Sequence, residues 1–147
     1  MDKAKVNLLL ADDDTDDRIF FQDALQDLSV KAALYTVEDG VELMNFLTSE
    51  ATILPDLLFL DINMPRKNGF ECLSEIKTNT KLKELPVIIF STSLDREMAD
   101  KFYDNGAHYY IRKPGDFIKL KRLISDALVL ATQPNSVQPP REEFILH

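Results

Sequence analysis

The sequence predicts an α/β fold, a doubly wound parallel sheet of five strands with helices on both faces. Five short apolar runs recur along the chain, and a segment of helical periodicity follows each run. The runs are apolar on consecutive residues, a pattern typical of strands that are covered on both faces. Alternation of this kind favours right-handed crossovers, and therefore a (βα)5 architecture.

Each expected element has recognisable boundaries. The strands are expected at Val6–Ala11, Ala32–Val37, Leu57–Leu60, Val87–Phe90 and Tyr109–Ile111. The helices are expected to open near Thr15, after Gly40, after Gly69, before Met98 and near Phe117. The fourth helix should be capped by Ser93 or Asp95 and should stop at Asn105–Gly106, because glycine readily adopts the left-handed conformation that ends a helix.

The composition is that of one globular domain. The chain has 147 residues, of which 45% are hydrophobic and 29% charged, and its formal net charge is −8. This acidity disfavours direct binding to DNA or to an anionic membrane. The single cysteine, Cys72, excludes an internal disulfide, and no apolar run approaches the ~18 residues of a membrane span. We therefore expect a cytoplasmic protein.

Residues 1–130 are expected to form this domain, and residues 131–147 a linker and tail with no output domain. Thr132–Pro140 contains three of the seven prolines, which indicates an extended linker. The residues that follow, Glu142–His147, nevertheless include Phe144 and two aliphatic side chains. Two interpretations stay open: a frayed terminus, or a tail that docks on its own domain or on a second copy of the chain.

Polar side chains follow four of the expected strands. Asp12 and Asp13 follow the first strand, Asp61 the third, Ser91 the fourth, and Lys113 the fifth. The carboxyl ends of parallel strands meet at one edge of the sheet, where ligands of such folds bind. Three carboxylates that lie close together need a proton or a cation, and oxygen ligands without His or Cys favour a hard ion such as Mg²⁺. The hydroxyl and the ammonium suit the oxygens of a phosphoryl group.

Neighbouring polar residues have simpler interpretations. Asp14, Asp16 and Asp17 fit the start of a helix, where aspartate interacts favourably with the helix dipole. The basic pair Arg66–Lys67 is equally consistent with steering of a phosphodonor and with ordinary solvation of a loop. His108 is assigned no catalytic role and is expected at an interface.

The sequence resembles the receiver domain of bacterial two-component response regulators of the CheY-like type over about residues 4–130. The motifs that carry the resemblance are Leu8–Asp14, Leu60–Pro65 with Gly69, Val87–Ser91 and Tyr110–Pro114. The C-terminal tail and the Ser-Thr-Ser run after the fourth strand are also similar to single-domain regulators paired with phytochrome-type kinases. The resemblance implies a flavodoxin-like strand order, 2-1-3-4-5.

The resemblance also implies a role for each matching residue. It implies that Asp61 is the phosphoacceptor, that Ser91 and Lys113 contact the phosphoryl group, and that Tyr110 is the switch residue. The implied Mg²⁺ ligands are Asp12, Asp13, Asp61 and the backbone carbonyl of Asn63. Phosphorylation would draw Ser91 toward the site, and Tyr110 would fill the space behind it. The bond between Lys113 and Pro114 is expected to be cis.

The implied function is that of a single-domain response regulator in a phosphorelay. A sensor histidine kinase or a histidine phosphotransfer protein would donate the phosphoryl group, and a downstream protein would bind the switched surface. Such a protein catalyses its own phosphorylation and dephosphorylation and is not an enzyme for an external substrate. A homodimer is compatible with the sequence. Two alternatives stay open, a pseudo-receiver that only binds partners and a phosphohydrolase with an aspartate nucleophile, although such enzymes usually carry a second acid where this chain has Asn63.

Overall fold

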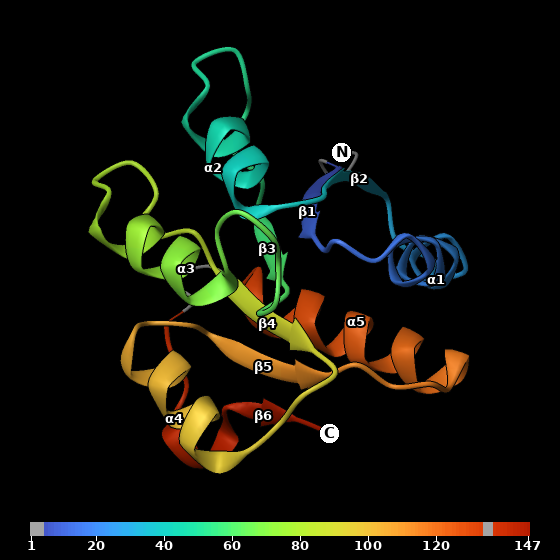
Figure 1. Cartoon of the computed structure of the whole chain (residues 1–147). Helices are drawn as coiled ribbons and strands as arrows, with labels where there is room; N and C mark the ends of the chain where they lie inside the picture. Colours follow the sequence, from blue (N-terminus) through green and yellow to red (C-terminus); the bar gives the residue numbers. More distant parts are fainter. Residues whose placement is uncertain (1–4, 134–136) are drawn as a thin grey trace.

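A computed structural model of the chain shows a parallel sheet of six strands in the order β2-β1-β3-β4-β5-β6 (Figure 1). The order confirms the expected 2-1-3-4-5 arrangement and adds one strand beside β5. The structure describes residues 5–133 and 137–147. Pro134 of the expected linker therefore lies outside the described residues, as do residues 1–4 at the amino terminus.

The elements follow the expected boundaries to within about a residue. The strands are β1 (Val6–Ala11), β2 (Ala32–Val37), β3 (Leu57–Leu60), β4 (Val87–Ser91), β5 (Tyr109–Arg112) and β6 (Ile145–Leu146). The helices are α1 (Thr15–Gln26), α2 (Gly40–Thr48), α3 (Gly69–Thr78), α4 (Arg96–Asp104) and α5 (Phe117–Ala131), and a short 3-10 turn at Arg141–Glu143 precedes β6.

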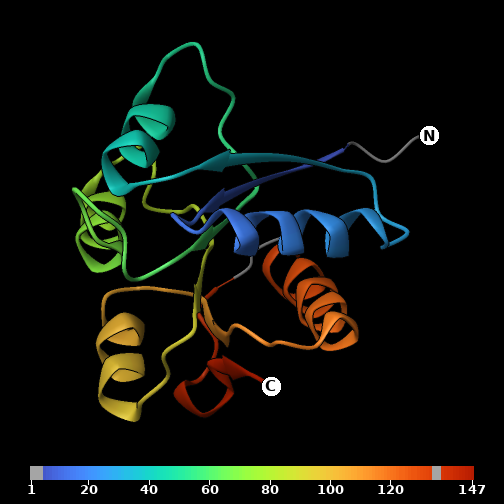
Figure 2. The same cartoon turned by 45° about the vertical axis from the view of Figure 1, so that its right-hand side comes forward.

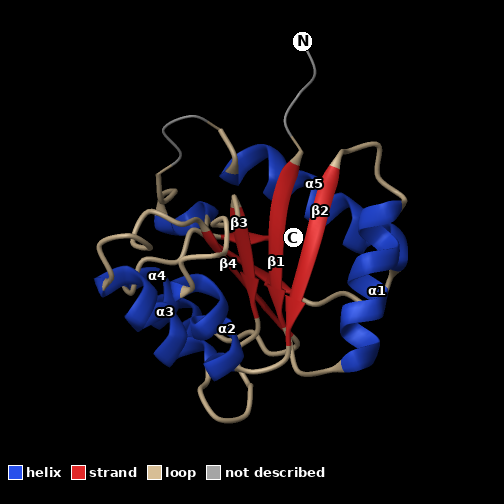
Figure 3. Cartoon of the chain, turned by 90° about the horizontal axis from the view of Figure 1, so that it is seen from above, coloured by secondary structure: helices blue, strands red, loops and turns tan. Residues whose placement is uncertain are grey.

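Two layers of helices enclose the sheet. Helices α1 and α5 lie on one face, and α2, α3 and α4 lie on the other (Figures 2 and 3). Within β1, Leu8 and Leu10 join the core beneath α1 and α5, whereas Leu9 and Ala11 join the core on the opposite face. Because both faces are buried, the strands are apolar on consecutive residues.

Short polar side chains start the helices. The residues Asp14, Asp39, Asn68, Asp95 and Asp116 each accept a backbone N–H from the first turn of the helix that follows. Asp95, and not Ser93, caps α4. At the other end of α4, Gly106 has φ of +96°, which confirms the predicted left-handed stop.

The C-terminal tail docks on its own domain. β6 pairs in parallel with β5, and the Phe144 side chain is only 2% exposed. The frayed-terminus interpretation is therefore wrong, and the tail extends the five expected strands by a sixth. A two-residue strand carries no periodicity that sequence analysis detects, since its pairing depends on a β5 edge about thirty residues earlier.

Candidate functional site

The carboxyl ends of β1 and β3 bring three aspartates together. Asp12, Asp13 and Asp61 place carboxylate oxygens within 4.8 Å of one another. Parallel pairing accounts for this, because Ala11 at the end of β1 is in register with Leu60 at the end of β3. Asp12 is fully buried and Asp61 is 6% exposed, whereas Asp13 is exposed. The cluster is therefore anchored in the domain and open on one side.

The ammonium group of Lys113 faces this cluster. Lys113 Nζ lies 2.8 Å from Asp12 Oδ2, 2.8 Å from Asp17 Oδ2 and 3.4 Å from Asp61 Oδ2. Burial works against its charge, but the bonds to Asp12 and Asp17 outweigh burial and raise the pKa of Lys113 above its ordinary value. The side chain is therefore a fixed cation that also packs over the ring of Phe90, at 5.5 Å from the centroid.

Asp61 is held in a distinct environment. Burial raises the pKa of Asp61 to about 6, and the charge of Lys113 opposes this rise. Its Oδ1 accepts the backbone N–H of Ile62 at 2.8 Å, so Oδ2 is the oxygen that faces Lys113. Gly69 supports the turn that follows, because a Cβ at this position would lie 2.3 Å from the backbone oxygen of Asp61.

The donor set fits a hard divalent cation. The buried Oδ2 of Asp12 accepts no hydrogen bond from the described residues and has the Lys113 ammonium as its ion-pair partner. Three carboxylates this close carry more negative charge than one ammonium balances. Carboxylate oxygens without nitrogen or sulfur ligands suit Mg²⁺, Mn²⁺ or Ca²⁺. Asn63 follows Asp61 in the same loop and lines a cavity of about 260 Å³ between that loop and α4.

Ser91 and Tyr110 both contact Ser93. The Ser91 side chain is fully buried at the end of β4, and its Oγ accepts the N–H of Ser93 at 3.3 Å. The Tyr110 ring is also fully buried, and its hydroxyl donates to the backbone carbonyl of Ser93. Burial raises the pKa of Tyr110 to about 12, so the hydroxyl remains a donor at neutral pH. The loop after β4 therefore links these two residues physically.

Asp17 is a site residue that sequence analysis assigned only to a helix start. It belongs to the first turn of α1, which opens immediately after the acidic run, and its carboxylate reaches Lys113. Its place in the first turn of the helix could have indicated this role, because the first turn of a helix that directly follows a strand lies at the same edge of the sheet. Asp14 does cap α1, as predicted.

Two further expectations are wrong. The described residues contain no cis peptide bond, so the Lys113–Pro114 bond is trans. The trans form is the lower-energy isomer of an X–Pro bond, and Lys113 reaches its three aspartates with it. His108 is 8% exposed and packs at the start of β5, so it is not an exposed interface residue.

The basic pair after β3 is engaged within the chain. Arg66 makes an ion pair with Asp39 at 3.3 Å, and Lys67 makes one with Glu75. The Arg66 backbone has φ of +69°, an unusual value for a residue with a side chain. These contacts favour a structural role for the pair.

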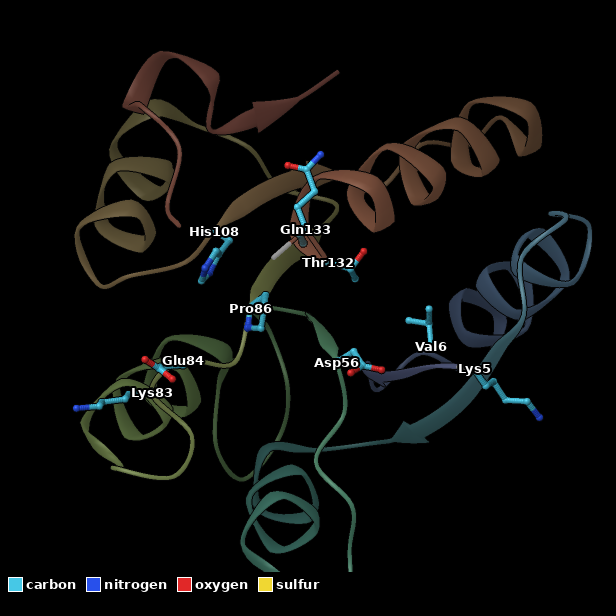
Figure 4. A pocket seen from close by; sticks show the side chains of 10 residues that line it. Lys5, Val6, Asp56, Lys83, Glu84, Pro86, His108, Thr132 and Gln133 are labelled. Carbon is cyan, nitrogen blue, oxygen red and sulfur yellow. The ribbon is translucent and has the colours of Figure 1, made fainter. Parts of the chain in front are cut away.

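A larger hollow lies at the opposite edge of the sheet. A cavity of about 740 Å³ is lined there by residues at or just before the amino ends of β1, β3, β4 and β5 and by residues at the end of α5 (Figure 4). They include Val6, Asp56, Pro86, His108 and Thr132. Its polar groups do not converge as the aspartates do, so cavity size does not mark the candidate site.

A family model and several relatives match this chain over most of its length. The family described as "Response regulator receiver domain" matches residues 8–125. Response regulator Rcp1 of Synechocystis sp. is 32% identical over 124 residues, which cover 82% of this chain and 84% of Rcp1. A probable chemotaxis protein CheY of Rhizobium etli is 29% identical over 120 residues, covering 82% of this chain and 90% of that protein.

Solved structures show the same similarity. The phosphorylated cyanobacterial phytochrome response regulator RcpA has a TM-score of 0.80 at 33% identity, over 89% of this chain and 98% of RcpA. The Mn²⁺-bound form of Rcp1 has a TM-score of 0.78 at 27% identity, over 92% of this chain and 99% of that structure. In the described part of this chain, no helix has the length and apolarity needed to span a membrane.

Proposed function

We propose that Asp61 is the phosphoacceptor of this chain, which belongs to the response regulator receiver domain family. Its similarity to Rcp1 and CheY-like proteins identifies the chain as a single-domain phosphoacceptor. The observation that carries the residue assignment is the position of Asp61 at the centre of the carboxyl edge. It lies within 4.8 Å of two other carboxylates and 3.4 Å from the Lys113 ammonium.

The reaction at Asp61 is a phosphoryl transfer. A carboxylate oxygen of Asp61 attacks the phosphorus of a phosphohistidine, and the N–P bond breaks. The electron pair of that bond returns to the imidazole, which takes up a proton, and an acyl phosphate remains on Asp61. Lys113 is positioned to balance the negative charge that arrives with the phosphoryl oxygens, and positioning and charge stabilisation are the main sources of catalysis in such transfers.

We assign Mg²⁺ as the cation, with Asp12, Asp13, Asp61 and the backbone carbonyl of Asn63 as its ligands. When bound, the ion supplies positive charge to the carboxylates and to the phosphoryl oxygens. The excess negative charge of the three carboxylates supports a divalent cation, as does the Mn²⁺-bound structure of Rcp1.

Ser91 and Tyr110 transmit the effect of phosphorylation from Asp61 to the protein surface. The phosphoryl group adds roughly −1.5 to −2 charges and three strong acceptors. The Ser91 hydroxyl donates to one of these oxygens and draws the loop at Ser93 with it. Because Tyr110 is hydrogen-bonded to that same loop, the surface formed by α4, β5 and α5 responds.

The partners follow from this role. The phosphodonor is a sensor histidine kinase or a histidine phosphotransfer protein, and the output is a downstream protein in the cytoplasm rather than DNA or a membrane. We assign residues 1–130 to the receiver domain and residues 131–147 to a linker and tail, and a homodimer is compatible with this arrangement. The chain catalyses its own phosphorylation and dephosphorylation. The assembled cluster, with Lys113 and Ser91 beside it, gives no support to a pseudo-receiver or a phosphohydrolase.

Intact-mass measurement after incubation with acetyl phosphate tests the proposal. We expect a single base-labile phosphoryl adduct on the wild type that requires Mg²⁺ and that is absent from Asp61→Asn. Asp16→Asn is the matched control, because Asp16 is an exposed aspartate of the same edge without a contact to Lys113. An adduct on Asp61→Asn, or none on the wild type, would overturn the assignment.

A further inference from the structure

The C-terminal segment 138–147 closes the open edge of β5. Ile145 and Leu146 are in parallel register with Tyr110 and Ile111, and the Tyr110 N–H donates to the Phe144 carbonyl at 3.0 Å. Without this segment, β5 would present unpaired backbone groups at the edge of the sheet. Figure 1 shows the segment in red, alongside β5 and close to α4.

Aromatic packing anchors the segment. Phe144 is buried, and the centroid of its ring lies 5.2 Å from that of Tyr103 and 6.2 Å from that of Tyr110. The Tyr103 hydroxyl donates to the Pro139 carbonyl at 2.6 Å, and the Gln138 side chain donates to the Ala107 carbonyl at 2.8 Å. The segment is therefore held by specific contacts with α4 and with the turn before β5.

Charges of opposite sign add to this packing. Arg141 makes ion pairs with Asp100 and Asp104 of α4 and stacks over the ring of Tyr103, at 4.5 Å from the centroid. At the end of the chain, Arg122 of α5 donates to a backbone oxygen of His147 at 2.6 Å. The surface of α4, β5 and α5 thus recognises a basic residue, then an aromatic residue, then two aliphatic residues in extended conformation.

The same contacts reach the candidate site through Tyr110. One side of the Tyr110 ring contacts Phe102 of α4, and Phe144 of the tail packs against it as well. Its hydroxyl is bonded to Ser93, whose N–H in turn donates to Ser91. While Phe144 is in place, Tyr110 is enclosed, so tail docking and the inward position of Tyr110 support each other.

We propose that the surface of α4, β5 and α5 is a peptide-binding site whose occupant is this chain's own segment 138–147, and that its occupancy is coupled to phosphorylation through Tyr110. This inference rests on the proposed function of Asp61. Phosphorylation and tail docking favour the same arrangement of Ser93 and Tyr110, so each strengthens the other. Coupling of this kind is reciprocal, because the two binding free energies are linked. The tail is then a ligand of this surface whose affinity depends on the phosphorylation state of Asp61.

Amide hydrogen exchange of the full chain tests this coupling, with beryllofluoride and Mg²⁺ as a mimic of the phosphoryl group. We expect beryllofluoride to slow exchange in residues 137–147 by about fivefold or more, a factor typical of coupling between two sites. Phe144→Ala should accelerate that exchange and weaken beryllofluoride binding, measured by ¹⁹F NMR, by a similar factor. Glu142→Gln, an exposed change in the same segment, should alter neither quantity.

Further measurements distinguish coupling of the tail to phosphorylation from phosphorylation of Asp61 itself. Arg141→Glu reverses a surface charge without changing the core and should also release the tail, so a folding defect in Phe144→Ala would not obscure the result. Uptake of beryllofluoride without any change in tail exchange would overturn the coupling while the function of Asp61 stood. An absence of uptake in the wild type would overturn both. Tail protection that grows with protein concentration would place the segment on a second copy and overturn docking within one chain.

Discussion

The two edges of the sheet both bury ionisable groups, with opposite results. At the carboxyl edge, groups of opposite charge converge, and Lys113 keeps its charge because Asp12 and Asp17 hold it. At the amino edge, the buried His108 and the half-buried Lys77 have no carboxylate partner among the described residues. Burial lowers the pKa of His108 to about 4, with Lys77 adding to the effect, and burial lowers the pKa of Lys77 to about 8.

This difference shows what makes a buried polar group functional. The Lys77 ammonium is satisfied by the backbone carbonyls of Lys83 and Leu85, whereas His108 Nδ1 has no hydrogen-bond partner among the described residues. His108 is therefore neutral at pH 7, and backbone carbonyls satisfy Lys77, so neither group gathers a counter-ion. At the carboxyl edge the charges cannot neutralise one another completely, and the remaining negative charge attracts a cation.

The largest expected effect tests the excess charge directly. Asp13→Ala should lower the affinity for Mg²⁺ by about 100-fold or more, because loss of even an outer partner of a metal ligand typically costs 10–100-fold. Isothermal titration with MgCl₂ measures this, with Asp16→Ala as a control of equal charge change. If the two variants bind Mg²⁺ equally well, the cation is held elsewhere.

The next effect concerns how much the buried charge of Asp61 destabilises the folded chain. Its pKa of about 6 in the folded chain lies above the ordinary value of 3.8 for an aspartate, so the folded state binds the proton more tightly. Protonation thus stabilises the fold fully below pH 3.8, and this contribution is lost as the pH rises through 6. Asp61→Asn should raise the free energy of unfolding at pH 7.5 by about 1–3 kcal/mol when no divalent cation is present.

Urea denaturation at pH 7.5 and pH 4 measures that gain. The gain should shrink at pH 4, where the wild-type carboxyl is largely protonated. A variant that is less stable than the wild type at pH 7.5 would show that the bond to Lys113 outweighs the burial of Asp61.

The amino edge should respond to acid in the opposite sense. The pKa of His108 falls from 6.5 to about 4 on folding, so the unfolded chain takes up the proton first. Stability from this group is complete above pH 6.5 and is lost as the pH falls toward 4, by up to about 1.4 kcal/mol per pH unit. His108→Gln should remove this part of the acid sensitivity. If the free energy of unfolding depends on pH equally in the wild type and in His108→Gln, His108 is not the group responsible for this acid sensitivity.

The smallest expected effect sharpens the role of Asp17. This carboxylate competes with Asp61 for Lys113, and it is partly exposed. Asp17→Asn should speed phosphorylation by acetyl phosphate about twofold to fivefold at saturating Mg²⁺, which corresponds to the small energies of exposed ion pairs. Asp16→Asn serves as the control. A slower reaction in Asp17→Asn would mean that Asp17 positions Lys113 productively.

Most of the fold and the composition of the site follow from local pattern. Strand runs, helix caps and the stop at Gly106 depend on neighbours within a few residues, so the sequence alone predicts them. The convergence of Asp12, Asp61 and Lys113 was also predictable, because parallel strands place their carboxyl ends at one edge. The burial of His108 was not predictable, because its surroundings form only when the chain has folded. The trans Lys113–Pro114 bond is the lower-energy isomer, and only the family resemblance implied a cis bond.

Short-range patterns specify the (βα)5 alternation, the acidic cluster and the residues that follow each strand, so each of these can be predicted from the sequence. Two contacts depend on the folded chain: the ion pair of Asp17 with Lys113 and the packing of Phe144 against Tyr110. Both contacts join segments far apart in sequence, and their energy comes from burial and charge pairing that exist only once the sheet has formed. The tail illustrates this best: a two-residue strand has no propensity of its own, and the edge of β5 and the anchor at Phe144 together define it.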